Sequence, residues 1–388
     1  MKSKKEAVLN VGSEKLTLVV IDEKYPTSIV YELCKEYAGF QNGQFFEKHE
    51  LFSVLSSMIQ ECEAAIFSKL ESILVGVPGE FTITVIKDIQ TQLSQTRRKI
   101  YPKDAHELLL NAASEVPDGF IPINASPIFY ILDSSEKTLN PEGSYAQYLG
   151  AKVSLVLCEK YFTDLFSNIF ESIGRDIEYT STLLAETMFL LPHTARDRGA
   201  FLLDVGYISS SLAYSKGDGI LFSKSFSLGG GYIAADLMQL LDIPYEHAYI
   251  LKSKINLNLN PMNSDMYYIS VNDGNYAYSI KKVNEIAAER ILDICSYVKQ
   301  AINLLPYNIP EFTTLYLTGS GFDNVIGSRE MLSKIIEMNV EIVGPSLIQY
   351  DKLSYAALSS LLSLKRSQIK VRFGSKIKSY LRNKFRRS

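Results

Sequence analysis

Two glycine-containing turns and one glycine-rich helix start are the places where this sequence could hold a ligand through its backbone. Residues 6–22 have the pattern strand, turn and strand around Gly12-Ser13, and residues 201–215 repeat that plan around Gly206. Alternating and β-branched residues on both sides of each turn predict hairpins. Residues 229–231, all glycine, precede a helical pattern, and such a helix start can bring backbone N–H groups close to a ligand.

Side chains that commonly perform nucleophilic or metal chemistry show no recognisable arrangement. Residues 209–211 are three serines, but the sequence places no His or Asp to activate them, so a run of serines at a strand edge is the simpler interpretation. The four histidines are scattered and show no zinc-binding spacing. The four cysteines are far apart, which is typical of reduced thiols in a cytosolic protein. We therefore predict no catalytic residue.

Hairpins, helices and buried strands must position the turns. Residues 47–70 show apolar positions at helical spacing, and a buried strand follows at residues 72–79, so we expect a mixed sheet covered by helices. Residues 81–169 differ, because strand-like pieces and two helical patterns form a unit with its own hydrophobic face. Further helices are predicted at residues 181–191, 229–241, 244–251, 283–304, 328–338 and 353–365.

Composition and charge limit the kinds of partner. The chain has 388 residues, of which 46% are hydrophobic and 21% charged, so it is globular and large enough for two lobes or more. The net charge is −3, although the last 24 residues carry ten Lys or Arg and no acidic residue. The rest is therefore acidic, which disfavours nucleic acid as the main partner. No apolar run reaches the roughly 18 residues of a membrane span, and no signal peptide is recognisable at the start.

The basic C-terminal stretch has the pattern of a membrane-binding helix. On an ideal helix its bulky apolar residues fall on one face: Phe373, Ile377, Tyr380, Leu381 and Phe385. Basic residues spread over the remainder, including Lys376, Lys378 and Arg382. An apolar face combined with basic residues suits an anionic membrane surface. A basic tail that is disordered or touches nucleic acid is the alternative, and it leaves the helical spacing unexplained.

Several motifs, in their order and spacing, resemble the actin-like ATPase superfamily and within it the FtsA family. The matching segments are residues 10–15, 203–206, 228–235, 317–320 and 354–357. A turn at residues 140–143 and the following residues 149–153 resemble the inserted subdomain that FtsA shares with the pilus protein PilM. The resemblance implies an α/β, ribonuclease H-type fold of two lobes with an FtsA-type inserted α+β subdomain.

The resemblance also implies how the chain is divided. The first core subdomain would comprise residues 1–80, 170–200 and 345–364, with the insertion at 81–169. The second core subdomain would comprise residues 201–228 and 305–344. Residues 229–304 would form the upper subdomain of the second lobe, and residues 365–388 the membrane-targeting tail.

In this family the turns would bind ATP with magnesium, and the residues at matching positions are Asn10, Gly12, Ser13, Lys15, Asp204, Gly206, Gly230 and Gly319. The sequence departs from the family at several corners of this site. Asn10 replaces an Asp, Tyr207-Ile208 replaces Gly-Gly, Ser211 replaces an Asp, and Ser320 replaces a Gly. The family's Glu and Lys near the ribose and base align with residues 249 and 250, a Tyr and an Ile. These departures predict weak nucleotide binding or none.

By resemblance, the chain is expected to be a peripheral protein on the cytoplasmic side of the cell membrane. It would tether FtsZ or other division proteins to an anionic membrane, and it would self-associate into filaments. Two alternatives stay open. One is a PilM-like scaffold of a pilus or secretion platform, which would not need the amphipathic tail. The other is an active ATPase that drives filament turnover, which would need the Tyr207-Ile208 turn to accommodate phosphate.

Overall fold

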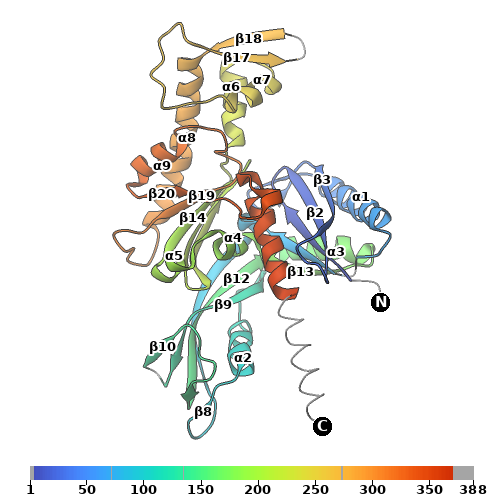
Figure 1. Cartoon of the computed structure of the whole chain (residues 1–388), viewed down its shortest axis with the longest axis vertical. Helices are drawn as coiled ribbons and strands as arrows, with labels where there is room; N and C mark the ends of the chain where they lie inside the picture. The colour runs from blue at the N-terminus through green and yellow to red at the C-terminus, as the bar shows by residue number, and fades with distance from the viewer. Residues whose placement is uncertain (1–3, 71, 134, 272–273, 370–388) are drawn as a thin grey trace.

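The computed structural model describes residues 4–70, 72–133, 135–271 and 274–369, and it shows two lobes built on the same sheet plan (Figure 1). The first lobe holds a five-stranded sheet of order β13-β6-β1-β2-β3. Its strands are β1 (Lys5–Val11), β2 (Lys15–Asp22), β3 (Ile29–Glu36), β6 (Ser72–Val77) and β13 (Asp176–Ser181). Strand β1, at the centre of this sheet, pairs antiparallel with β2 and parallel with β6.

The second lobe repeats this plan with a sheet of order β16-β15-β14-β19-β20. Its strands are β14 (Ala200–Val205), β15 (Ser210–Lys216), β16 (Gly219–Phe226), β19 (Leu315–Thr318) and β20 (Val340–Ile342). Strand β14 pairs antiparallel with β15 and parallel with β19, as β1 does with β2 and β6. The predicted hairpins around Gly12 and Gly206 therefore occupy equivalent places in the two lobes.

Successive side chains of a strand point to opposite sides of its sheet. In both lobes the two faces are apolar, and helices cover each of them. In the first lobe, α1 (Lys48–Ile66) and α3 (Lys160–Ser172) cover the face that includes Leu9. The helix at residues 356–369 covers the opposite face, which includes Val8. In the second lobe, α8 (Ile280–Asn303) and α9 (Ser328–Ile336) cover one face. The connecting helices α4 (Thr182–Leu190) and α5 (His193–Arg198) lie on the other.

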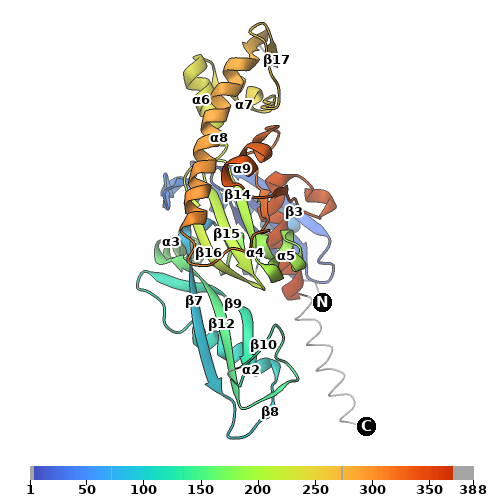
Figure 2. The same ribbon diagram turned by 90° about the vertical axis from the view of Figure 1, so that its left-hand side faces the viewer.

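The insertion projects from the two lobes as a separate sheet (Figures 1 and 2). Its four main strands have the order β10-β9-β12-β7, namely β7 (Thr82–Gln92), β9 (Phe120–Leu132), β10 (Glu136–Thr138) and β12 (Tyr148–Glu159). Helix α2 (Pro102–Ala112) packs against it, and β8 (Arg98–Lys99) pairs with β11 (Tyr145–Ala146). The hydroxyl group of Ser154 donates a hydrogen bond of 2.6 Å to the carbonyl of Ile220, so the insertion also contacts the second lobe.

The upper subdomain lies at the opposite end of the molecule from the insertion (Figures 1 and 2). It contains α6 (Gly231–Leu241), α7 (Tyr245–Lys252) and the hairpin of β17 (Met266–Val271) and β18 (Gly274–Ser279), together with the first turns of α8. Small elements complete the fold: β4 (Phe40–Gln41), β5 (Gln44–Phe45) and short 3₁₀ turns at Gly79–Phe81, Ile348–Tyr350 and Leu353–Tyr355. No helix in the described part of the chain is long and apolar enough to cross a bilayer.

The last described helix extends further than the sequence predicted. We expected the core to end at residue 364, but the helix continues through residue 369, and the Lys365 side chain is completely buried. Its ammonium group lies 3.1 Å from Glu6 Oε2 and 3.3 Å from Glu178 Oε2. The sequence places Lys365 in the basic tail, because its charge suits a membrane surface. The structure instead places it in an ion cluster of the first lobe.

Replacing Lys365 with Ala should destabilise the protein strongly, because it removes the ammonium group that lies 3.1 Å from the completely buried carboxylate of Glu6. We expect a loss of about 3–5 kcal/mol in the free energy of unfolding, measured by urea denaturation. Lys299→Ala is the control, because Lys299 pairs with Glu337 on the exposed surface, where a pair contributes at most about 1 kcal/mol. Equal losses in the two variants would contradict this assignment.

Candidate functional site

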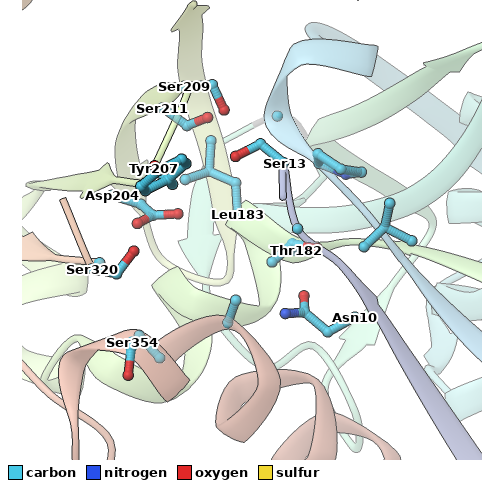
Figure 3. Close-up of a pocket in the computed structure, with 18 of the residues that line it drawn as sticks. Asn10, Ser13, Thr182, Leu183, Asp204, Tyr207, Ser209, Ser211, Ser320 and Ser354 are labelled. Atoms are coloured by element: carbon cyan, nitrogen blue, oxygen red, sulfur yellow. The ribbon is translucent and has the colours of Figure 1, made fainter. Parts of the chain in front are cut away.

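The two hairpin turns meet across a small cavity between the lobes (Figure 3). Its volume is about 120 Å³, whereas small-molecule sites commonly have roughly 300–1,000 Å³. Seven of the eight residues predicted at the nucleotide site line it: Asn10, Gly12, Ser13, Lys15, Asp204, Gly206 and Gly319. The eighth, Gly230, is packed against the backbone of Gly321 instead, where a Cβ atom would lie only 1.9 Å from the carbonyl oxygen.

The turns are closed by matching hydrogen bonds and touch one another. The N–H of Gly12 donates to the carbonyl of Lys15 at 3.0 Å, and that of Gly206 donates to the carbonyl of Ser209 at 2.8 Å. Between the lobes, the N–H of Ile208 donates to the hydroxyl oxygen of Ser13 at 3.2 Å. A backbone N–H of the second turn is therefore directed at the first turn rather than left open for an anion.

The backbone N–H groups at the glycine-rich start of α6 are hydrogen-bonded to carbonyl groups of the second hairpin turn. The N–H of Gly230 donates to Gly206 at 2.9 Å, and that of Gly231 donates to Tyr207 at 2.7 Å. Glycine is needed here, because a Cβ at position 229 would lie 2.5 Å from the carbonyl oxygen of Tyr207. These N–H groups, which the sequence suggested for ligand binding, are already satisfied by the protein.

Tyr207 lines the cavity beside Asp204 and reaches toward α7 (Figure 3). Its hydroxyl group is hydrogen-bonded to that of Tyr245, whose ring centroid lies 6.2 Å from that of Tyr249. The other side of the Tyr207 ring packs against Gly231, where a Cβ would be 2.8 Å from the ring. Burial, and then the bond to Tyr245, raise the pKa of Tyr207, so it stays a neutral phenol.

A buried lysine faces the same region from the end of α7. Burial lowers the pKa of Lys252 to about 8, and the opposite charges of Glu14 and Asp323 partly offset this effect. Burial likewise raises the pKa of Glu14, which belongs to the first turn. The sequence comparison had placed the family's lysine at Ile250, whereas the lysine that faces the cleft here is two residues further along.

Two carboxylates lie together at the floor of the cavity. Glu186 comes from α4 and Asp204 from the end of β14, and both line the cavity. Gly319 has a φ of +93°, and its missing Cβ leaves room for Asp204 Oδ1, which would lie only 2.1 Å from such an atom. Burial raises the pKa of Asp204 to about 6, and burial and then the charge of Asp204 raise that of Glu186. The carboxyl group of Asp204 therefore costs stability as the pH rises through about 6.

Further contacts hold the lobes together beside the cavity. The β4–β5 hairpin turns through Asn42 and Gly43, with φ of +51° and +69°, as a tight two-residue turn requires. The N–H of Asn42 donates to Ser227 Oγ at 2.8 Å, and that hydroxyl group donates to Glu80 Oε1 at 2.8 Å. Gly79 also packs against Ser211, since a Cβ there would be 2.3 Å from its hydroxyl oxygen.

Sequence reasoning missed Glu186 and Lys252. A single Glu in the apolar run of α4 was the available signal, since an acid inside a buried helix requires an explanation. The predicted membrane-binding residues lie outside the described residues: Phe373, Lys376, Ile377, Lys378, Tyr380, Leu381, Arg382 and Phe385.

Comparison with known proteins gives both sequence and fold relatives. No protein-family model matches the chain. The cell division protein FtsA of Staphylococcus epidermidis is 22% identical over 255 residues, which are 64% of this chain and 54% of that protein. FtsA of Streptococcus pneumoniae serotype 2 is 19% identical over 343 residues, which are 87% of this chain and 73% of that protein. The chain thus spans about half the length of the first curated relatives that it matches.

Solved structures share the fold at low sequence identity. MreB5 of Spiroplasma citri bound to ADP has a TM-score of 0.58 at 9% identity, covering 95% of this chain and 98% of that one. A chain of the PilM–PilN type IV pilus biogenesis complex has a TM-score of 0.56 at 14% identity, covering 93% and 98%. A chain of the MamK double helical filament has a TM-score of 0.52 at 9% identity, covering 93% of this chain and 98% of that one.

These structural neighbours confirm the predicted actin-like α/β fold of two lobes. The curated relatives add a likeness in sequence to cell division proteins named FtsA. In sequence the chain is thus similar to FtsA, and in fold it is similar to actin-like proteins.

Proposed function

We propose that this protein tethers FtsZ or other division proteins to the cytoplasmic face of the cell membrane. The observation that carries the proposal is the similarity to cell division proteins named FtsA over 64% to 87% of the chain. The basic, amphipathic pattern of residues 373–387 supplies the membrane part. Self-association into filaments belongs to the proposal as well, and the likeness to the MamK filament subunit supports it.

We further propose that the tether works without nucleotide turnover, because the residues of the cleft do not fit ATP with magnesium. A phosphate would have to replace the bond between Ile208 and Ser13 and the carbonyl groups at the start of α6. The Tyr207 ring lies beside Asp204, and the cavity between the two hairpin turns has a volume of only about 120 Å³. The active ATPase is therefore the weaker alternative.

Isothermal titration with magnesium-ATP should detect no binding at micromolar concentrations. The double variant Tyr207→Gly, Ile208→Gly is the informative comparison, because it removes the ring and restores the glycines usual for the family. We expect this variant to bind nucleotide more tightly than the natural chain. Micromolar binding by the natural chain, together with ATP turnover that is lost on Asp204→Ala, would overturn the proposal.

The protein should sediment with anionic vesicles, and Ile377→Glu with Phe385→Glu should abolish this. Each buried apolar side chain contributes about 1.5–3 kcal/mol, less when insertion is partial, so replacing two of the five with charged residues removes a large part of the binding energy and adds a cost for bringing two carboxylates to the membrane. The matched control is Phe67→Glu with Phe312→Glu, which adds the same charge at two exposed aromatic positions of the body. Loss of binding in both double variants, or in neither, would contradict the assignment.

FtsZ should co-sediment with anionic vesicles in the presence of the full chain but not of a chain that ends at residue 369. The truncation starts after residue 369 because Lys365 and Ile369 are buried in the body. The same experiment tests the PilM-like scaffold, which is favoured by the near-complete coverage of the PilM–PilN chain. Vesicle binding without FtsZ recruitment would argue against FtsZ as the partner and leave other division proteins or this alternative.

A further inference from the structure

A well-ordered turn at the edge of the first lobe presents an aromatic and a basic side chain to solvent. Residues 23–27 connect β2 to β3, and within them Tyr25 is 69% exposed and Lys24 is exposed as well. The Oδ1 atom of Asp22 accepts from the N–H of Lys24 at 2.8 Å and from that of Tyr25 at 3.4 Å. The same carboxylate pairs with Lys5 at 2.7 Å. The backbone of the turn is therefore held in place, while the Tyr25 ring contributes little to the core.

This turn is bound directly to the last described helix. Arg366 Nε donates to the carbonyl of Pro26 at 2.6 Å, and Arg366 Nη2 donates to that of Thr27 at 3.2 Å. Arg366 lies about one helical turn before residue 369, where the described helix ends. Figures 1 and 2 show this helix end at the same edge of the first lobe as the N-terminus, with the insertion off to one side. The turn thus lies beside the point at which the C-terminal tail leaves the body.

The length of the tail next to the body requires this edge to lie close to any membrane that the tail binds. Ile369 is completely buried in the body, and Phe373 is the first residue of the predicted apolar face. Phe373 comes only four positions later, and an extended chain covers at most roughly 3.3–3.6 Å per residue, or about 14 Å in all. When Phe373 enters the headgroup region, the helix end and the turn beside it are brought to the same lipid surface.

From these observations we propose that the turn at residues 23–27 is a second membrane contact. The Tyr25 ring enters the headgroup region of an anionic bilayer, and the ammonium group of Lys24 lies against lipid phosphates. Tyrosine is enriched at membrane–water interfaces, because its ring is apolar while its hydroxyl group can stay hydrated. A lysine close to an anionic surface is attracted to it. The inference rests on the proposed attachment through the tail and adds a contact made by the body itself.

The charge around the turn suits an anionic partner, although the body as a whole is acidic. Glu23 is the acidic residue of the turn, and basic residues outnumber it. They are Lys24, Arg366 on the neighbouring helix, and Lys370 and Arg372 at the start of the tail. An average face of an acidic body would be repelled by anionic lipid, so a locally basic edge beside the tail is the part that can approach the surface.

Two contacts fix the orientation of the body, whereas one contact leaves it free to rotate. The second contact forms within a molecule that is already attached, so it requires little affinity of its own. The upper subdomain lies far from this edge in Figures 1 and 2 and would therefore be held away from the lipid. Phe67 follows α1, which covers the opposite face of the sheet from the last helix, and it is not part of the proposed contact.

A tryptophan reporter tests the contact, because the natural chain contains no tryptophan. In the full chain, vesicles of phosphatidylglycerol and phosphatidylcholine should shift the emission of Tyr25→Trp to shorter wavelength. Lipids brominated on their acyl chains should quench it. The matched control is Tyr268→Trp, which should show neither effect, since Tyr268 is 71% exposed but lies on β17 of the upper subdomain.

The outcomes separate this contact from the attachment on which it rests. If the protein sediments with the vesicles but the Tyr25→Trp emission does not shift, this contact is overturned and attachment through the tail stands. Equal shifts at both positions would also overturn it, because the body would then adsorb without a preferred face. Failure of the natural chain to sediment would overturn the attachment and this contact together.

Charge reversal at Lys24 tests the electrostatic part of the contact. Lys24→Glu should weaken binding of the full chain to the same vesicles by about fivefold or more, because a basic side chain at the lipid surface becomes acidic. Lys254→Glu changes the net charge equally at an exposed position just after α7 and should have a much smaller effect. Equal losses in the two variants would mean that net charge alone matters, which would contradict a contact at this turn.

Discussion

Backbone N–H groups at the start of a helix must find acceptors, and at α6 the protein supplies its own. The carbonyl groups of Gly206 and Tyr207 accept from Gly230 and Gly231, so the second hairpin turn is drawn onto the helix end. Only glycine permits such close approach at positions 229 and 231. Once the turn lies there, its Ile208 N–H meets Ser13 and the Tyr207 ring lies over the cavity. The need of the α6 N–H groups for acceptors thereby accounts for the position of the second hairpin turn in the cleft.

The two lobes are consequently joined by hydrogen bonds between their own residues, such as that from Ile208 to Ser13, in the cleft where a ligand would otherwise connect the two turns. The contacts extend beyond the turns, through the β4–β5 hairpin to Ser227 and Glu80 and through Gly79 to Ser211. Polar contacts of this kind are short and directional, so they favour one relative position of the lobes.

Sequence patterns predicted the sheets and most helices, because strands such as β1 and β14 are nearly continuous apolar runs that are followed by glycine turns. Seven of the eight residues that the sequence predicted at the nucleotide site line one cavity. Sequence patterns could not predict that Lys365 is buried, because a lysine in a basic run has the same local pattern whether or not distant carboxylates surround it. Glu6 is 359 positions away in the chain, and only the fold brings the two together. Glu186 differs, because a single Glu in the apolar run of α4 is a local signal of a buried acid.

The buried ammonium group of Lys365 also determines how mechanical force would enter the body. It joins the final helix to two strands of the first sheet, β1 through Glu6 and β13 through Glu178. Tension applied to the chain beyond residue 369 would be resisted there in shear, across several hydrogen-bonded strands, rather than by peeling one terminal helix away. The first lobe is thus the part of the molecule that would carry the load, while the second lobe is attached to it through the connecting helices, the cleft contacts and the bond from Ser154 to Ile220.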